Sequence, residues 1–341
     1  MCDVREVAWS KAEELLADRS LSAPIEQTEA WAAFQATIEG RTPWGLVALS
    51  DGAEPVALVS LIDYQTHGYH YLRAPHGPFW FDDPTEEQEQ AALEALRAYV
   101  RKKDRKQLFM RLAVDHDLGI CSPVLSGVPY DATVVIDVTG GDEAILTRMK
   151  PRGRRDVRKS LREAPITCAD ETEEALRSFD EYYPVMVETA QRDGFSPAPQ
   201  EDYERMMHIL GAEHCRLFVG RLADEQTVCT WSLCTVSGTR AVRYYAASLT
   251  GTMRNHVSDR LCYFECCELG KRGCAEYDLM GIGSEFSPSL MGLNEFKTKF
   301  CKEVRRVAPD RDLPIKKLEY GALQTAKRGR QALRDLRTKK A

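Results

Sequence analysis

One short segment of the chain places lysines beside aromatic residues in a pattern that has two interpretations. Residues 292–303 read GLNEFKTKFCKE, in which Phe296 and Phe300 alternate with Lys297 and Lys299. A period of two predicts a short strand with one apolar and one basic face. Lys297 is then either a solvated lysine on that strand or a cation positioned to stabilise negative charge in a reaction. The pattern alone favours the first interpretation.

The chain offers no convincing nucleophilic triad and no metal site. It contains eleven cysteines, an odd number, and no Cys-x-x-Cys pair. Without signs of secretion, this composition argues against a disulfide framework. A structural zinc site needs four converging ligands, and the spacing of cysteine and histidine does not supply them. We therefore expect buried free thiols and no bound metal.

Composition indicates a soluble globular protein. The chain has 341 residues, of which 43% are hydrophobic and 29% charged, enough for two domains of ordinary size. No apolar run approaches the roughly 18 residues of a membrane-spanning helix. Residues 1–16 lack the basic start and apolar core of a signal peptide. We therefore predict a cytoplasmic protein.

Basic residues are concentrated in two segments of an acidic chain. The formal net charge is −6, yet residues 148–162 carry eight Lys/Arg and one acidic residue, and residues 316–340 carry nine and two. Such segments indicate a polyanionic partner, namely RNA, a phosphorylated substrate or anionic lipid. Two solvated helix faces are the competing interpretation, and the pattern does not decide between them.

Two parts of the chain repeat one order of elements. Residues 44–114 predict three strands joined by turns, an irregular loop, a helix over 85–103 and a further strand. Residues 216–281 predict the same order. This β-β-β-loop-α-β order matches the core of an N-acetyltransferase-like (GNAT) domain.

We therefore predict an α/β fold with mixed sheets in two tandem GNAT-like domains. Domain 1 covers residues 1–143, with 310–341 packing back on it, and domain 2 covers 144–309. Acetyltransferases of this fold bind the pyrophosphate of coenzyme A with a glycine-rich loop at the start of the helix. Neither APHGPFWFDDP nor SLTGTMRNH fits that loop, which argues against acetyl-CoA.

Several segments, in this order and spacing, resemble the Fem family of aminoacyl-tRNA-dependent peptidyltransferases, in its compact form without a helical arm. They are PIEQTEAW, HGP, ATVVIDVTGGDEAILTRMKPRGRRDVRKS, TAQRDGF, the run from RYYAAS to MGIG, and GLNEFKTKF. The resemblance implies two GNAT-like domains and the addition of amino acids to the peptide of cell-wall precursors. It also implies a phenylalanine-lysine pair, matched here by Phe296 and Lys297.

The implied reaction is aminolysis of the activated ester of an aminoacyl-tRNA, which needs no covalent nucleophile. It benefits from a positioned donor to the developing oxyanion. We assign this role to Lys297, with Phe296 shaping the pocket. The resemblance therefore favours the functional interpretation of Lys297 over the solvated one.

Four further candidates lie at the predicted site of the second repeat. Tyr244 and Tyr245 come near the end of its third strand, where a GNAT fold opens, and strand neighbours face opposite sides. We expect one in the site and one in the core, although a core position suits either. Ser248 and Arg254 lie on the loop that follows. They either bind phosphate of the tRNA acceptor end or form a plain capping loop.

Three candidates concern the acceptor. Arg192 and Tyr203 flank DGFSPAPQED and either bind acceptor phosphate or carboxylate or lie on the surface. Gln35 stands in WAAFQ, where the family often has a basic residue near substrate phosphate. Ala113 and Val114 stand where the family often has an acidic residue and a proline. These departures leave the nature of the acceptor open.

The basic segments acquire specific roles from the resemblance. Arg152, Arg154, Arg155 and Arg158 are expected to guide tRNA phosphates, a contact that weakens with salt. The basic helix expected near the C-terminus contacts either tRNA or, transiently, an anionic membrane.

Three enzymatic hypotheses follow. The first is an aminoacyltransferase that joins an amino acid from aminoacyl-tRNA to an amine of a lipid- or nucleotide-linked muropeptide, with aminoacyl-tRNA as co-substrate and no cofactor. The second is a tRNA-dependent peptide ligase of secondary metabolism, and the third an acyl-CoA N-acyltransferase. A non-catalytic binding protein for RNA or phosphorylated peptide is the remaining alternative. The transferred amino acid and the oligomeric state stay open.

Overall fold

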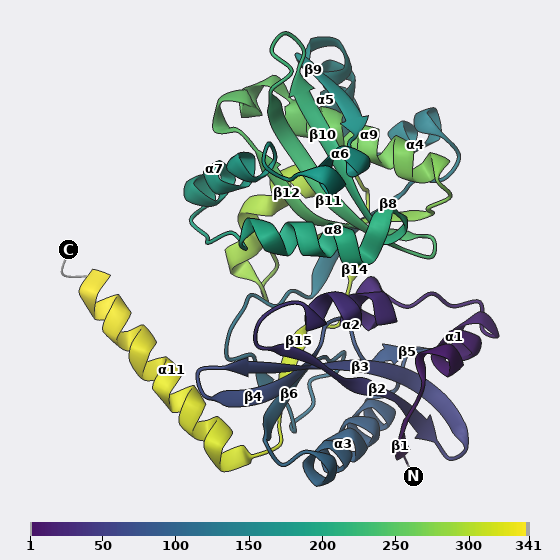
Figure 1. Cartoon of the computed structure of the whole chain (residues 1–341), viewed down its shortest axis with the longest axis vertical. Coiled ribbons are helices and arrows are strands. Elements are labelled where there is room, and N and C mark those ends of the chain that lie inside the picture. The colour runs from purple at the N-terminus through teal and green to yellow at the C-terminus, as the bar shows by residue number, and fades with distance from the viewer. Residues whose placement is uncertain (1, 339–341) are drawn as a thin grey trace. The chain divides into compact units, whose positions relative to one another are not determined.

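The computed structural model describes residues 2–338, which form two compact units (Figure 1). Unit 1 combines the described residues up to Pro129 with those from Ala308 onward, and unit 2 spans Tyr130–Val307. Each unit has its own mixed sheet covered by helices. The predicted α/β class with mixed sheets is therefore confirmed.

The sheet of unit 1 has the strand order β1-β2-β3-β4-β6-β15-β7, with β5 paired to β3. Its neighbours are antiparallel except for β4 and β6, which run parallel. The elements of unit 1 are β1 (Cys2–Glu6), α1 (Trp9–Ala17), η1 (Ile25–Gln27), α2 (Glu29–Ala36), β2 (Arg41–Asp51), β3 (Glu54–Thr66), β4 (Tyr69–Ala74), β5 (Phe79–Trp80), α3 (Glu86–Lys103), β6 (Gln107–Ala113), β7 (Ser122–Pro123), β15 (Asp310–Pro314) and α11 (Lys317–Thr338).

Helix α3 forms where the sequence predicts it, for local reasons. The Thr85 hydroxyl accepts from the backbone N–H of Gln88, and the Gln88 side chain accepts from the backbone N–H of Thr85, which is a capping box. Glutamates in its first turn and basic residues in its last turn complement the helix dipole. Leu93 and Leu96 are fully buried against alternate residues of the sheet.

The C-terminal part of unit 1 is attached through a buried ion pair. Arg111 on β6 donates from Nε and Nη2 to the carboxylate of Asp312 on β15, at 2.7 and 3.0 Å. The Tyr320 hydroxyl donates to the same carboxylate at 3.0 Å. Strand β15 thus completes the sheet, and the first turn of α11 is fixed to it.

The sheet of unit 2 has the order β14-β8-β13-β12-β11-β10-β9. Its elements are β8 (Ala132–Asp137), α4 (Asp142–Arg148), α5 (Pro151–Glu163), β9 (Ile166–Asp170), α6 (Thr172–Arg177), α7 (Tyr183–Asp193), α8 (Gln200–His214, interrupted at Gly211), β10 (Cys215–Leu222), β11 (Val228–Ser237), β12 (Arg240–Ser248), η2 (Thr250–Asn255), α9 (Val257–Lys271), β13 (Glu276–Gly281), η3 (Pro288–Leu293), α10 (Asn294–Lys297) and β14 (Arg305–Arg306).

The two faces of this sheet are covered by different helices, and strand β11 shows why. Ser232 and Cys234 face helix α9 and its acid Glu265. Trp231, the residue before Ser232, faces the other side, where its indole donates to the Tyr182 carbonyl at 2.8 Å and its ring contacts Tyr203 of α8. Alternation along one strand therefore supplies both cores.

The boundary between the units differs from the predicted position after residue 143. Strand β8 pairs antiparallel with β13 and β14, so it is part of the second sheet. The apolar run ATVVIDV is a strand as expected, but its pairing partners lie more than 130 residues further on, and local pattern carries no information about them.

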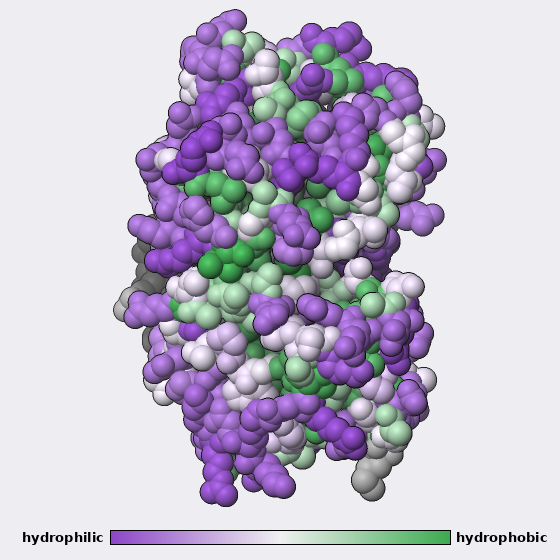
Figure 2. Space-filling view, turned by 45° about the vertical axis from the view of Figure 1, so that its right-hand side comes forward, coloured by the Kyte–Doolittle hydropathy of each residue, from purple (hydrophilic) through white to green (hydrophobic). Residues whose placement is uncertain are grey.

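Hydrophilic side chains dominate the face of the molecule seen in Figure 2.

Gly270 on α9 provides a test of helix packing in unit 2. A methyl group there would lie 2.2 Å from the carbonyl oxygen of Val138. Gly270→Ala should lower the free energy of unfolding by about 1–3 kcal/mol, because backbone must shift to relieve the clash. Gly321→Ala, in a helical position with nothing within 4 Å, should instead be neutral or stabilise by up to about 1 kcal/mol. Denaturant unfolding measures both, and equal effects would contradict the packing argument.

Candidate active site

The sheet of unit 2 opens between β12 and β13. These parallel strands pair at Arg240–Glu276, Ala241–Tyr277 and Val242–Asp278, and then separate. Strand β12 continues alongside β11 to Ser248, whereas β13 continues alongside β8. Backbone groups beyond the last pair must therefore find other partners.

Irregularities in both strands accompany this separation. Tyr244 is an extra residue of β12, since Tyr245 pairs with Leu233 and Arg243 with Cys234. On β13, Met280 has a φ of 63°, a conformation that non-glycine residues seldom adopt. Such strained positions concentrate at functional sites.

Asp278 supports the irregular part of β13. Its carboxylate accepts from the Met280 backbone N–H at 2.8 Å, from the Thr133 hydroxyl and from Arg240 at 2.5 Å. It is 4% exposed. These contacts give Asp278 a structural role in holding the Met280 and Gly281 carbonyls in place.

The ammonium of Lys297 binds to those two carbonyls. Its Nζ lies 2.9 Å from the Gly281 oxygen and 3.3 Å from the Met280 oxygen. The structure records these two acceptors for the three N–H donors of the ammonium. Burial is the main cause that lowers the pKa of Lys297 to about 8, and the nearby Arg243 guanidinium lowers it further, against the opposite effect of Asp278.

The segment around Lys297 is helical, so the predicted strand over residues 296–300 is wrong. Helix α10 begins at Asn294, whose side chain bonds to both the N–H and the carbonyl of Gly283 at 2.7 and 2.9 Å. Phe296 and Phe300 are four residues apart and therefore share a face of a helical turn as well as of a strand. Their rings contact at 5.2 Å, which satisfies the apolar pattern without a strand.

Lys299 has a different environment from Lys297, although the strand pattern predicted one shared basic face. It is 9% exposed and its ammonium pairs with Asp259 of α9 and, at 3.7 Å, with Asp156 of α5. His256 Nδ1 lies 3.3 Å from the Asp259 carboxylate. Lys299 thus joins three segments of unit 2 and is structural.

The start of α9 is not arranged to bind a pyrophosphate. Asp259 lies in the first turn of this helix, where the carboxylate takes the place of an external anion at the positive end of the helix dipole. The Ser248 hydroxyl is engaged internally with Thr230 Oγ1 at 2.7 Å and with Ser258 Oγ at 3.1 Å. Arg254 is exposed on η2. The structure therefore brings Ser248 and Arg254 near one helix end, but leaves little reason for phosphate to bind there.

The predicted tyrosines have unequal access. Tyr203 is 2% exposed, with its ring stacked on Phe179 at 5.5 Å and edge-on to Tyr245 at 5.0 Å. This position gives Tyr203 a packing role and not a surface one. Tyr244 and Tyr245 are half-buried and in contact at 5.2 Å, and Tyr245 is the one that extends the aromatic core.

Arg192 links α7 to the end of β12. Its Nη1 donates to the Ser248 carbonyl at 2.7 Å, and Nε and Nη2 donate to Asp193. The Arg192 side chain is 23% exposed. Arg192 of α7 is thereby fixed next to the open end of β12, the strand that carries Tyr244.

Gln35 belongs to unit 1, where its amide is buried and engaged. It is 1% exposed, and its Oε1 accepts from Arg41 Nη1 at 2.9 Å and from the Tyr64 hydroxyl at 3.0 Å. Arg41 and Tyr64 line a cavity of about 750 Å³ within unit 1. Gln35 therefore orients residues of this cavity and does not line it.

The four arginines of α5 are not equivalent. Arg152 pairs with Glu295 of α10 at 2.5 Å, and Arg154 donates to the carbonyls of Thr147 and Met149. Arg155 pairs with its neighbour Asp156. The structure records no partner for Arg158 among the described residues, and its side chain is exposed. The basic helix thus lies next to α10, with Arg158 the most available cation of the four.

Sequence reasoning missed Arg243, which lies beside Phe296, and its ion-pair partner Glu265. Arg243 of β12 has its guanidinium carbon 5.7 Å from the centre of the Phe296 ring, and it pairs with Glu265 of α9. Both charges lie within apolar runs, RAVRYYAAS and CYFECC. The available signal for these two residues was a charge at a position that the apolar pattern assigns to the core.

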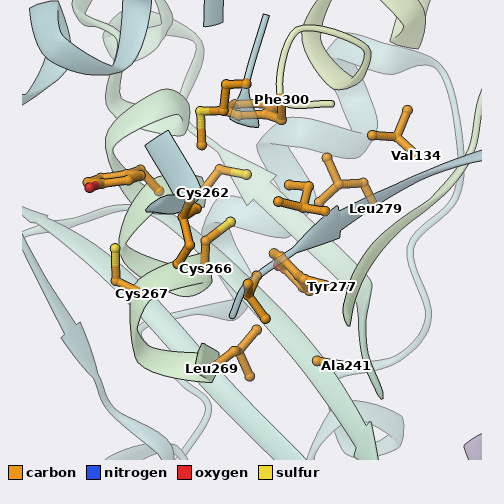
Figure 3. Packing of buried hydrophobic residues seen from close by; sticks show 14 of the residues in the cluster. Val134, Ala241, Cys262, Cys266, Cys267, Leu269, Tyr277, Leu279 and Phe300 are labelled. Atoms are coloured by element: carbon orange, nitrogen blue, oxygen red, sulfur yellow. The ribbon is translucent and has the colours of Figure 1, made fainter. Parts of the chain in front are cut away.

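All eleven cysteines are free thiols, as predicted, but only seven are buried, and Cys2, Cys121, Cys168 and Cys301 are partly exposed. Figure 3 shows Cys262 and Cys266 in the core of unit 2 near Phe300 and Tyr277. Burial raises the pKa of Cys266 well above its usual value, which makes the thiol unreactive.

Within the described part of the chain, no group of three or more His, Cys, Asp or Glu side chains is placed to hold a metal ion. None of the helices in the described part of the chain is both long and apolar enough to cross a membrane.

Comparisons with known proteins show similarity in sequence and in fold. The FemAB family model matches residues 223–328. The structure of FemX matches with a TM-score of 0.71 and 15% identity, over 94% of this chain and 100% of that one. L-PGS from Bacillus licheniformis matches with a TM-score of 0.52 and 12% identity, over 95% and 97% of the two chains. No match was found among curated proteins.

A tandem GNAT protein from the clavulanic acid biosynthesis pathway matches with a TM-score of 0.50 and 10% identity, over 92% of this chain and 99% of that one. The family-model match, together with the GNAT-like fold, supports a transferase. The fold prediction of tandem GNAT-like domains is confirmed. The predicted resemblance to the Fem family is likewise confirmed, because the family model matches in sequence and FemX matches in fold.

The ion pairs of Lys299 predict a stability effect that separates it from an ordinary lysine. Lys299→Met should lower the free energy of unfolding by about 3 kcal/mol, because it leaves the nearly buried carboxylate of Asp259 without its cation. Lys302→Met, at an exposed neighbouring position, should change it by less than about 0.5 kcal/mol. Denaturant titration distinguishes the two, and a stable Lys299→Met variant would show that the ion pair is dispensable.

Proposed function

We propose that this protein is an aminoacyltransferase that joins the amino acid of an aminoacyl-tRNA to an amine of a peptidoglycan precursor, a lipid- or nucleotide-linked muropeptide. The observation that carries the proposal is the Lys297 ammonium, held by two backbone carbonyls beside Phe296 where β12 and β13 separate. The family match over residues 223–328 covers this region.

The reaction asks for positioning and charge stabilisation. The neutral amine of the acceptor attacks the ester carbonyl, and a carbon–nitrogen bond forms. The tetrahedral oxyanion collapses, the carbon–oxygen bond to the ribose breaks, and the proton lost by the amine ends on the ribose oxygen. Lys297 donates a hydrogen bond to the oxyanion, an interaction worth about 3 kcal/mol. Phe296 covers the site and limits access of water to the ester.

Two observations bear on the alternatives. Asp259 occupies the helix end that would bind the pyrophosphate of coenzyme A, which weighs against an acyl-CoA N-acyltransferase. The engaged amide of Gln35, at a position where a basic residue would face phosphate, favours a tRNA-dependent peptide ligase of secondary metabolism as the second candidate.

The partners follow from the surface charges. Arg158 and the exposed part of α5 suit contact with tRNA phosphates, an interaction that weakens as salt is raised. Helix α11 brings Lys327 and Arg328 to the surface, where they suit tRNA or an anionic membrane. The proposed reaction uses aminoacyl-tRNA as co-substrate without a further cofactor, and it suits a cytoplasmic enzyme.

A transfer assay tests the proposal. Purified protein, tRNA charged with radiolabelled amino acids, and muropeptide or small-peptide acceptors should give a labelled peptide product, and ribonuclease treatment of the tRNA should abolish it. Lys297→Met should lower the turnover by a factor of about 10², whereas the exposed Lys302→Met control should retain it. Product formed from acetyl-CoA, or transfer that survives ribonuclease, would count against the proposal.

The titration of Lys297 predicts the pH dependence of transfer. The pKa of about 8 means that the ammonium loses its proton above that pH. Because the charged form is the oxyanion donor, kcat/KM should fall as pH rises through about 8. Lys297→Arg keeps a cation at higher pH and should remove this descending limb in whatever activity remains. A rate that instead rises through pH 8 in the wild type but not in Lys297→Arg would identify a neutral lysine acting as base.

A further inference from the structure

Arg243 occupies a special place in the opening of the sheet. It follows Val242, the last residue of β12 that pairs with β13, and precedes the extra residue Tyr244. Its side chain is nonetheless 8% exposed. The strand therefore turns a full positive charge inward at the point where the two strands separate.

This charge is matched by Glu265, which is completely buried on α9. Arg243 Nε and Nη2 each lie 3.3 Å from an oxygen of this carboxylate. Glu265 also accepts from the Ser232 hydroxyl on β11 at 2.5 Å and from the Tyr277 hydroxyl on β13. The carboxylate is thus satisfied by groups from three adjacent strands.

Stability alone does not account for such a pair. Desolvating two charges costs about as much as their attraction returns, and apolar residues of similar volume often replace buried ion pairs without loss. A buried pair beside a candidate active site therefore calls for a role in that site.

Arg243 touches one member of the Phe-Lys pair directly. Its guanidinium carbon is 5.7 Å from the centre of the Phe296 ring. The Lys299 ammonium lies 5.1 Å from the same ring, and Phe300 meets it edge-on at 5.2 Å. The ring is thus held by two fixed cations, an interaction that restrains both the ring and the backbone leading into the next residue.

The charges around Lys297, the other member of the pair, leave it in a positive environment. Arg243 on β12 repels its ammonium, and Asp278 on β13 attracts it. Asp278 is already neutralised by Arg240. Beyond Phe296, Lys299 is balanced by Asp259 and Asp156. The pair of Arg243 with Glu265 is looser, at 3.3 Å, than the 2.5 Å pair of Asp278 with Arg240, so Arg243 is the nearby cation whose charge acts on Lys297.

We propose that Arg243, paired with Glu265, is a positioning residue for both members of the Phe-Lys pair, because its guanidinium fixes the Phe296 ring and its charge acts on the Lys297 ammonium. This inference rests on the proposed function for its meaning, since a less stable ammonium gains more from a hydrogen bond to an oxyanion. The residue acts through Phe296 and Lys297 and does not itself take part in the reaction.

The test is a double variant that removes both charges and keeps the shape. In Arg243→Met/Glu265→Gln, the glutamine retains an acceptor for Ser232 and Tyr277. The Lys297 titration is followed by NMR of carbon-13-labelled lysine side chains, with its signal assigned by its loss in Lys297→Arg. The midpoint should rise by up to about one pH unit, because the nearby cation has been removed, and Glu265, the charge removed with it, is not among the groups that act on the Lys297 ammonium. An unchanged midpoint in the folded variant overturns the electrostatic part of the proposal.

Arg243→Lys separates charge from ring contact and serves if the double variant does not fold. It should leave the Lys297 midpoint near that of the wild type but lower kcat by a factor of about 10 with little change in KM, because an ammonium cannot lie flat against the ring. A wild-type kcat overturns the ring-fixing part. The matched control, Arg216→Met/Asp170→Asn, removes another ion pair of unit 2 (2.9 Å) and should alter neither readout.

The NMR measurement needs no substrate, so the two proposals fail separately. A shifted midpoint in a protein that shows no transfer from tRNA would leave the role of Arg243 intact and overturn the proposed function. Transfer from tRNA with an unshifted midpoint would do the reverse.

Discussion

The separation of β12 from β13 is the constraint on which the candidate site depends. Two parallel strands that stop pairing after Val242 and Asp278 leave backbone polar groups that must still be satisfied. A lysine from a distant segment supplies the donors for the Met280 and Gly281 carbonyls. Hydrogen bonding to these two carbonyls fixes the ammonium in place and also keeps the two strands from pairing there.

The two units use one order of elements to different ends. In unit 1 the equivalent strands, β4 and β6, remain paired from His70–Gln107 to Ala74–Leu112, and β15 continues the sheet beyond β6. In unit 2 the equivalent pairing ends early and α10 follows the open strand. Duplication of a fold therefore does not duplicate a site, because a change in strand pairing decides where a side chain can enter.

What sequence reasoning could reach depended on whether the signal was local. Helix α3 was predictable because its cap, its dipole charges and its apolar spacing all lie within twenty residues. The repeat was visible for the same reason. The segment around Phe296 misled because residues four apart satisfy two periods, and only the contact of Asn294 with Gly283 decides for the helix.

The rest of the site could not be predicted because its partners are remote in sequence. Lys299 pairs with Asp156, which lies more than 140 residues earlier in the sequence. Arg243 of strand β12 pairs with Glu265 of helix α9. The residue type alone does not distinguish an exposed lysine from a buried one. The Fem resemblance selects Lys297 as the candidate, but it does not indicate the surroundings that lower its pKa.

The attachment of β15 to β6 has a consequence for the order of events during synthesis. The pair Arg111–Asp312 joins residues on opposite sides of unit 2 in the sequence. A ribosome therefore releases all of unit 2 before the last strand of the first sheet exists. Until then, β6 presents an unpaired edge, of the kind that invites association with other chains. The middle of the chain is thus able to fold first, and the N-terminal unit waits for residues made nearly two hundred positions later.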